Sequence, residues 1–270
     1  MKHKAAPVML TMYHREIFTH AKLLRNENLG CEVPVVDANQ VRNLSPEHIA
    51  RLKGAIELTG FYPFVHAPFI EIYPAARDHV LRDYSRSLIF QAAEFAQELN
   101  SKSMIVHTGF FYFLNEKQID SWADRFVEFL EYFLRLIPQI EILIENDTEP
   151  NTKPFEAILN RCKDSRVGLC LDIGHLYAHQ RMEISEWLIP FAKRIRHVHL
   201  HDNNLLTDQH LFVGEGKIPY DDVFSQLAKH RTNCTFSLET GCFDPDRTIK
   251  CVEYVREKLG KVRPQWLRLQ

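Results

Sequence analysis

The chain has 270 residues, of which 45% are hydrophobic and 25% are charged, a mixture typical of a globular protein with a substantial core. Its 33 basic and 35 acidic residues leave a net charge of −2, which excludes a bulk electrostatic attraction to nucleic acid or to an anionic membrane. There is no low-complexity tract and no sustained heptad, so disordered, collagen-like and coiled-coil proteins are excluded as well.

Six cysteines are spread along the chain without a Cys-x-x-Cys pair, and a chain of this length does not need disulfides for its stability. We therefore expect free thiols in a reducing compartment. The apolar stretch at residues 7–12 is too short for a signal peptide or for a membrane span. These features predict a cytoplasmic protein that does not bind membranes.

Eight short apolar runs recur along the chain and lack an alternating polar face, which is typical of buried parallel strands. They cover residues 6–12, 30–36, 62–66, 103–107, 140–145, 166–172, 195–199 and 235–239. Amphipathic stretches with helical spacing lie between them. These stretches cover residues 46–58, 80–99, 119–137, 153–162, 184–192, 220–230 and 246–259.

Two of the helical stretches show additional features, an N-cap signal and a pattern of aromatic residues. Ser45 and Pro46 stand where an N-cap and a first helical residue are expected for the stretch 46–58. The aromatic residues of the stretch 119–137 recur at helical spacing, and we expect them to pack in the core against the sheet rather than to bind a cofactor.

Eight strand–helix pairs without an antiparallel block, a long linker or an internal repeat predict a closed (β/α)8 TIM barrel, an α/β fold that spans residues 1–270 as a single domain. An open doubly wound sheet is the alternative, and it normally has a glycine-rich phosphate loop after its first strand. Here the first strand ends in Met12-Tyr13-His14, which favours the barrel.

Active sites of TIM barrels lie at the carboxyl ends of the strands. Six of the predicted strands end in residue types that bind metal ions: His66, His107, Glu145, Asp172, His199 and Glu239. Three more candidates lie just beyond these ends: His175, Asp208 and His210. We expect all nine side chains to converge at the mouth of the barrel.

Each of these residues alone also has a structural explanation. A single histidine at a strand end is more often hydrogen-bonded than a metal ligand, and Asp172 could cap the next helix. Burying so many carboxylates and imidazoles together without a cation would be costly, however. Nitrogen and oxygen ligands without cysteine favour Zn²⁺, Mn²⁺, Fe²⁺ or Co²⁺, and nine ligands would serve one to three ions.

Seven segments occur in an order that resembles one known family. They are residues 64–69, 105–109, 143–146, 170–175, 197–203, 208–216 and 237–240. On these segments the chain resembles the xylose isomerase-like TIM-barrel superfamily, also called AP endonuclease family 2. This superfamily includes sugar and sugar-phosphate isomerases and epimerases as well as endonuclease IV.

The resemblance implies two alternative metal sites. The isomerases and epimerases imply one divalent ion on Glu145, Asp172, His199 and Glu239, with Glu145 and Glu239 flanking the substrate as catalytic acid and base. Such an ion would lower the cost of an enediolate. The resemblance to endonuclease IV implies three ions, held respectively by His66, His107 and Glu145, by Glu145, Asp172, His199 and Glu239, and by His175, Asp208 and His210. A hydroxide that bridges these ions would attack a phosphodiester.

The presence of His66, His107 and the Asp208/His210 pair favours the three-ion cluster, because many isomerases of this type lack these residues. The sequences after His107 and Glu145 depart from endonuclease IV, and the loops after the first two strands lack an arginine and aromatic set that would enter a duplex. Nucleic acid is therefore not an expected partner.

The sequence thus predicts a metal-dependent isomerase or epimerase that acts on a small sugar or sugar phosphate. The alternatives are a phosphoester hydrolase and a non-catalytic barrel that binds metal or sugar. The sequence is compatible with an oligomer.

A few further residues have weaker assignments. Lys217 is either a contact for a substrate phosphate or a solvated surface lysine, and Phe110 and Tyr112 either wall the substrate pocket or pack their own loop. His201 and Asp202 are expected to orient His199 from behind.

Overall fold

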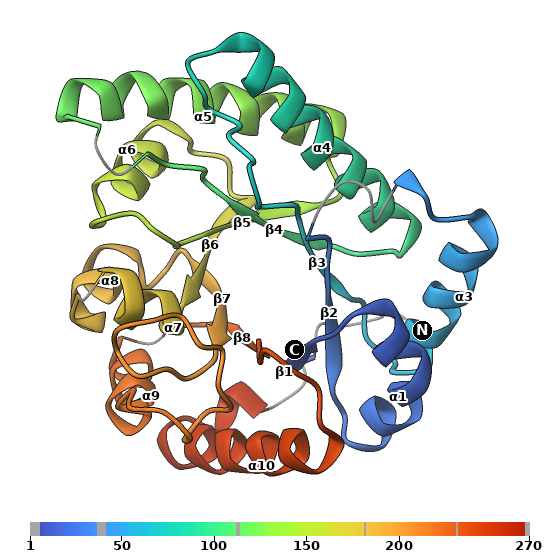
Figure 1. The fold of residues 1–270 in the computed structure, drawn as a ribbon. Helices are drawn as coiled ribbons and strands as arrows, with labels where there is room; N and C mark the ends of the chain where they lie inside the picture. The colour runs from blue at the N-terminus through green and yellow to red at the C-terminus, as the bar shows by residue number, and fades with distance from the viewer. Residues whose placement is uncertain (1–5, 37–41, 112–113, 181, 231, 268–270) are drawn as a thin grey trace.

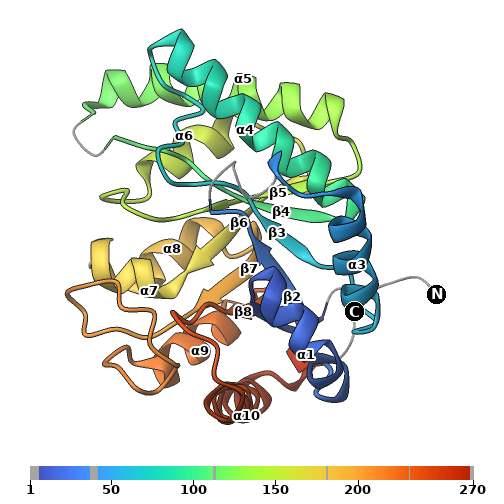
Figure 2. The ribbon, with the colours of Figure 1, turned by 45° about the vertical axis from the view of Figure 1, so that its right-hand side comes forward.

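Eight parallel strands close into a barrel in the order β1 to β8 in a computed structural model of the chain, and helices cover its outside (Figure 1, Figure 2). The structure describes residues 6–36, 42–111, 114–180, 182–230 and 232–267. The predicted (β/α)8 architecture is confirmed.

Each predicted apolar run coincides with one strand, with small differences at the ends. The strands are β1 (Val8–Thr11), β2 (Gly30–Pro34), β3 (Phe64–His66), β4 (Ser103–His107), β5 (Glu141–Glu145), β6 (Val167–Asp172), β7 (Ile195–Leu200) and β8 (Thr235–Leu238). Their side chains are almost all buried on both faces of the sheet, as a closed barrel wrapped in helices requires.

The main helices follow the predicted stretches, with one addition. They are α1 (His14–Asn26), α3 (Pro46–Glu57), α4 (His79–Glu98), α5 (Glu116–Leu136), α6 (Lys153–Arg161), α8 (Ile184–Phe191), α9 (Tyr220–Lys229) and α10 (Pro245–Val262). The predicted stretches do not include α1, although Ile17, Ala21 and Leu24 are buried at helical spacing.

Short irregular elements complete the fold. A single turn, α7 (Ile173–His175), leads into a π-helical segment (Leu176–Gln180), and a 3-10 turn (Pro264–Leu267) follows α10. π-helical geometry is rare in proteins, and where it occurs it is often at a functional site. The sequence pattern predicts none of these three segments, because each is too short to show a period.

The N-cap and the aromatic packing predicted from the sequence are both present in the structure. The Ser45 hydroxyl accepts the His48 N–H at 3.2 Å and Pro46 begins α3. The aromatic residues of α5 are buried in the core: Trp122, Phe126, Phe129 and Phe133.

Strand register sets the height of the candidate site residues. His107 pairs with Glu145 between β4 and β5, and Asp172 pairs with His199 between β6 and β7. A register shift between Leu169 and Cys170 precedes the second of these pairs. Neighbouring strands therefore present their metal-binding residue types at the same level of the barrel.

All six cysteines are free in the structure. In the described parts of the chain, no helix combines the length and the apolar character that crossing a membrane would require.

Candidate metal centre

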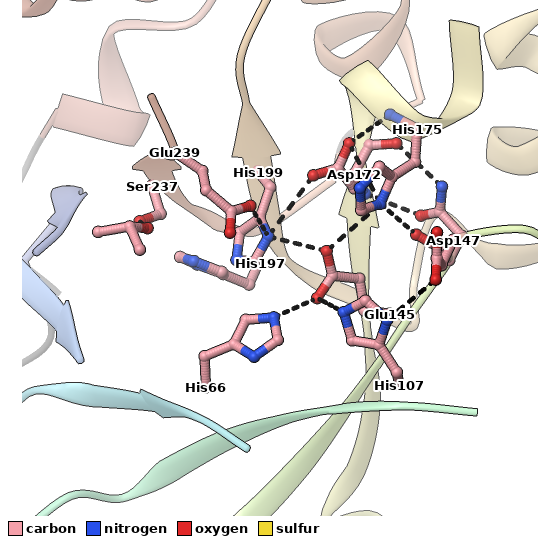
Figure 3. A network of polar contacts seen from close by, with 12 residues as sticks. His66, His107, Glu145, Asp147, Asp172, His175, His197, His199, Ser237 and Glu239 are labelled. Atoms are coloured by element: carbon pink, nitrogen blue, oxygen red, sulfur yellow. Dashed lines mark hydrogen bonds and ion pairs between the residues drawn. The ribbon is translucent and has the colours of Figure 1, made fainter. Parts of the chain in front are cut away.

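The nine residues expected at the mouth of the barrel gather in three adjoining groups. Figure 3 shows the first two groups together with His175. Within each group the ligand atoms lie within 4.8 Å of one another. The groups are His66, His107 and Glu145, then Glu145, Asp172, His199 and Glu239, and finally His175, His201, Asp208 and His210. His201 is an addition to the third group that the sequence did not predict.

Glu145 lies at the centre of these groups and is fully buried. Its Oε2 lies 2.9 Å from His66 Nε2 and 3.2 Å from His107 Nε2, while its Oε1 lies 3.0 Å from His199 Nδ1 (Figure 3). One carboxylate at the end of β5 therefore joins imidazoles from β3, β4 and β7.

Three carboxylates surround one ring nitrogen of His199. Nδ1 lies 3.0 Å from Glu145 Oε1, 3.0 Å from Glu239 Oε2 and 3.6 Å from Asp172 Oδ2. A ring nitrogen carries at most one proton, so a single imidazole does not satisfy three carboxylates. This arrangement has the donor set and the charge that a divalent cation would complement.

Unsatisfied atoms support the same conclusion. Three buried polar atoms of the groups make no hydrogen bond with the part of the chain that the structure describes: Glu239 Oε2, Asp208 Oδ1 and His201 Nδ1. Such atoms are rare in folded proteins, and an ion is one of the recognised explanations. The residues present therefore fit a metal ion.

Five imidazoles have one nitrogen held by an acceptor and the other turned toward a carboxylate of the groups. The held nitrogens are His66 Nδ1 on Ala67 O, His107 Nδ1 on Asp147 Oδ2, His175 Nδ1 on Asn146 O, His199 Nε2 on Glu32 Oε2, and His210 Nδ1 on Glu239 O. Because carbonyl and carboxylate oxygens only accept, each ring donates from its held nitrogen. This pattern is typical of histidines that bind metals through the other nitrogen.

The carboxylates and imidazoles of the centre stabilise each other's charged forms. Burial alone would raise the pKa of the Glu145 carboxyl, but the imidazoles of His199, His107 and His66 outweigh it and hold this pKa well below its usual range. Burial opposes the charge on His107, yet Glu145 and Asp147 raise its pKa to about 10. The pKa of His210 rises to about 9, because Asp208 and Glu239 outweigh its burial.

The third group depends on the loop between β7 and α9. Asp202 is almost fully buried, and its carboxylate accepts backbone N–H groups from Asn203, Gly214 and Ile218 at 2.8, 2.9 and 3.1 Å. The loop thereby brings Asp208 Oδ2 to 2.9 Å from His210 Nε2.

Two expectations about neighbouring residues were wrong. His201 and Asp202 do not orient His199: His201 Nε2 lies 3.1 Å from Asp172 Oδ1 and its ring stacks on His210, while Asp202 organises the loop. The reason is that β7 ends at Leu200, so these residues lie beyond the level of His199.

Two residues of the centre were missed by the sequence analysis. Glu32 holds His199 from below, and Asp147 lies 3.3 Å from His107 and 3.4 Å from His179. Asp147 is the second residue after β5 and offered a positional signal. Glu32 lies within an apolar run and offered none beyond being an acidic residue there.

The weaker assignments have mixed outcomes. Phe110 is buried, packs on Trp122, and lines a cavity of about 380 Å³ next to His107 and Asp147. Lys217 is exposed. Tyr112 lies outside the described residues.

Comparisons with known proteins agree with this architecture. The uncharacterized protein MJ1311 of Methanocaldococcus jannaschii is 31% identical over 208 residues, which cover 73% of this chain and 70% of that protein. A D-tagatose 3-epimerase-like protein of known structure is 25% identical, with a TM-score of 0.74 over 87% of this chain and 90% of its own. Endonuclease IV from Thermus thermophilus is 18% identical, with a TM-score of 0.68 over 94% of this chain and 99% of its own, and shares the fold. A family model described as xylose isomerase-like TIM barrel matches residues 29–259, and the chain therefore belongs to this family.

Proposed function

We propose that this protein is a divalent-metal-dependent isomerase or epimerase that acts on a small sugar or sugar phosphate. The observation that carries the proposal is the group of Glu145, Asp172, His199 and Glu239, in which three carboxylates face one imidazole nitrogen. The similarity to a D-tagatose 3-epimerase-like protein supports the same class of reaction.

The nitrogen and oxygen donors suit Zn²⁺ or Mn²⁺, with Fe²⁺ or Co²⁺ as alternatives. When bound, such an ion supplies Lewis-acid polarisation of neighbouring carbonyl and hydroxyl oxygens of a substrate. The proposal assigns Glu145, Asp172, His199 and Glu239 to this ion.

The two glutamates differ in what they offer to a substrate. The Glu239 side chain is 19% exposed and its Oε2 makes no hydrogen bond with the described residues, whereas the Glu145 side chain is sealed among three imidazoles. We therefore assign to the partly exposed Glu239 carboxylate the transfer of a proton at the substrate carbon next to the carbonyl. Glu145 is fully buried and joins the first two groups, so we assign it to the metal and not to proton transfer.

A phosphoester hydrolase is the second candidate. The observation that favours it is the presence of three complete groups, with Glu145 shared by two of them and a third formed by His175, His201, Asp208 and His210. An isomerase with one ion does not require the first or the third group, whereas hydrolysis with several ions uses them all.

Metal content per chain distinguishes the two candidates. Untagged protein purified without chelators, or reconstituted with Zn²⁺ or Mn²⁺, should be compared with the His66→Ala and His210→Ala variants by mass spectrometry. One ion that neither variant loses, together with turnover of aldoses, ketoses or their phosphates, supports the isomerase or epimerase. Two or three ions that decrease in either variant, with turnover of phosphoesters, contradict it. Bound metal without turnover of either substrate class identifies a non-catalytic barrel.

Metal uptake by the first and third groups, which the hydrolase candidate requires, is expected to release protons at neutral pH. In the metal-free protein the pKa values of His107 and His210 are about 10 and about 9, so both imidazoles are charged at pH 7. A histidine binds metal only in its neutral form, and each of these rings must lose a proton when it binds. Titrating metal-free protein with ZnCl2 in weak buffer with a pH indicator measures this release, and uptake without acidification would contradict the assignment of these ligands.

The raised pKa of His107 also makes the stability of the metal-free protein depend on pH. The folded pKa of His107, about 10, lies above its ordinary value of 6.5. Its charge therefore stabilises the fold fully below pH 6.5, and this contribution is lost as the pH rises through about 10. Thermal melting across this range should show the decline in metal-free protein and a smaller one in metal-loaded protein.

A further inference from the structure

Glu32 is a buried carboxylate that the proposed reaction does not use. It lies on β2 with an exposure of 0%, and its Oε2 lies 3.1 Å from Nε2 of His197 and 3.1 Å from Nε2 of His199. The Thr11 hydroxyl approaches its Oε1 at 3.5 Å. The carboxylate thus closes the barrel interior directly beneath the second group.

The hydrogen bonds at Glu32 determine where the two imidazoles carry their protons. An ionised carboxylate only accepts, so His197 and His199 both donate from Nε2. His197 Nδ1 lies 2.7 Å from the Thr235 hydroxyl, which donates to it. His199 Nδ1 is the ring nitrogen that faces Glu145, Asp172 and Glu239.

From this geometry we infer that Glu32 is a positioning residue, which holds His199 with its proton on Nε2 and presents the lone pair of Nδ1 to the metal of the second group. The inference rests on the proposed function, because it takes His199 as a metal ligand. A negative acceptor behind the ring also makes the imidazole a stronger donor toward the ion.

Packing alone does not explain a carboxylate at this position. The surrounding barrel interior contains Met9, Phe64 and Cys170, and an uncharged side chain would fill it without the cost of burying a charge. Glu32 also differs from the acceptors behind His66, His175 and His210, which are neutral backbone carbonyls.

Glu32 is not assigned as a metal ligand itself. Its ligand atoms lie within 4.8 Å of those of His66 and His199, but two ring N–H groups already point at Oε2. A cation there would have to displace both protons. The hydrogen-bonded arrangement therefore supports a role behind the ligand.

Zinc binding to the Glu32→Gln variant tests the inference. The amide carries no negative charge, so it is a weaker acceptor for both ring N–H groups and holds the Nε2 proton of His199 less firmly. In competition with a chelator, Zn²⁺ affinity of the group that contains His199 should fall about 10- to 100-fold, while the third group is unchanged. In the His175→Ala variant, Zn²⁺ affinity of the third group should fall, while that of the group that contains His199 is unchanged.

Glu141→Gln is the matched control. Glu141 lies at the start of β5, at the opposite end of the barrel, where it pairs with Arg196 and accepts from Ser103. Its loss should leave zinc affinity at the wild-type value. If Glu32→Gln also binds zinc as tightly as the wild type, the inference is wrong while the proposed function stands, and wild-type protein that binds no metal contradicts both.

A second measurement does not depend on the folding of a variant. Nitrogen-15 NMR of the zinc-loaded wild-type protein reports which ring nitrogen of His199 carries hydrogen. The expected result is a proton on Nε2 and none on Nδ1. A proton on Nδ1, or a zinc-induced shift at Nε2 in place of Nδ1, would overturn the assignment of Glu32.

Discussion

Replacing Glu145 with alanine is expected to remove metal from two groups at once. Its oxygens contact His66, His107 and His199, so one substitution takes a ligand from the first group and from the second. Residues that only orient ligands change metal affinity by about 10- to 100-fold, and the loss of a shared ligand should exceed about 100-fold. Activity should fall at least in proportion.

The same variant should be less stable even without metal. At pH 7 the Glu145 carboxylate is ionised and offsets buried positive charge on its imidazole neighbours. Removing one partner of such a buried pair costs about 3–5 kcal/mol, because the other partner stays buried without compensation. Chemical denaturation of the metal-free protein measures this loss in the free energy of unfolding.

Glu141→Gln is the control for this prediction too, since it changes a glutamate of the same strand at the other end of the barrel. Metal content by mass spectrometry and unfolding by urea should both be measured on the two variants. Wild-type metal content in Glu145→Ala would refute the shared role of this carboxylate, whatever its effect on stability.

Gly174→Ala is expected to destabilise the protein by about 1–3 kcal/mol and to disrupt the third group. A Cβ atom at Gly174 would fall within the imidazole ring of His201, which is fully buried and has no space to move. Displacing this ring breaks its contact with Asp172 and its stack on His210. Any metal of the third group should be lost, while the second group keeps its ion.

Gly54→Ala is the matched control for Gly174→Ala. Gly54 is exposed within α3, and nothing lies within 4 Å of the position that its Cβ would take. The same substitution there should stabilise the protein by about 0.5–1 kcal/mol, because alanine favours the helix. Thermal melting and metal content of both variants check the contrast, and equal behaviour of the two would contradict the packing argument.

The barrel was predictable because its strands are buried on both faces and appear as separate apolar runs. The strand-end residues were predictable for a related reason: in a closed parallel barrel every strand ends at the same face, so His66 and Glu239 meet although they are distant in sequence. Helix α1 has the same helical period, with Ile17, Ala21 and Leu24 on its buried face, although the predicted stretches do not include it.

Other parts of the site depend on contacts that a single sequence does not display. Glu32 meets His197 and His199 only because closure of the barrel through β8 and β1 brings β2 near β7. His201 did offer a signal, since His197, His199 and His201 alternate and share the inward face of an extended segment. The expectation that it supports His199 was wrong because its ring contacts Asp172 and Asp208 instead.

The loop organised by Asp202 gives the centre a modular construction. Asp208 and His210 lie on a connection between β7 and α9, and that connection is held by the Asp202 carboxylate and by one antiparallel bridge between Asp202 and Leu211. The first and second groups stand on strand ends and on residues that directly follow them. Shortening this single connection would therefore delete two ligands of the third group without altering the barrel, while the first and second groups would stay in place.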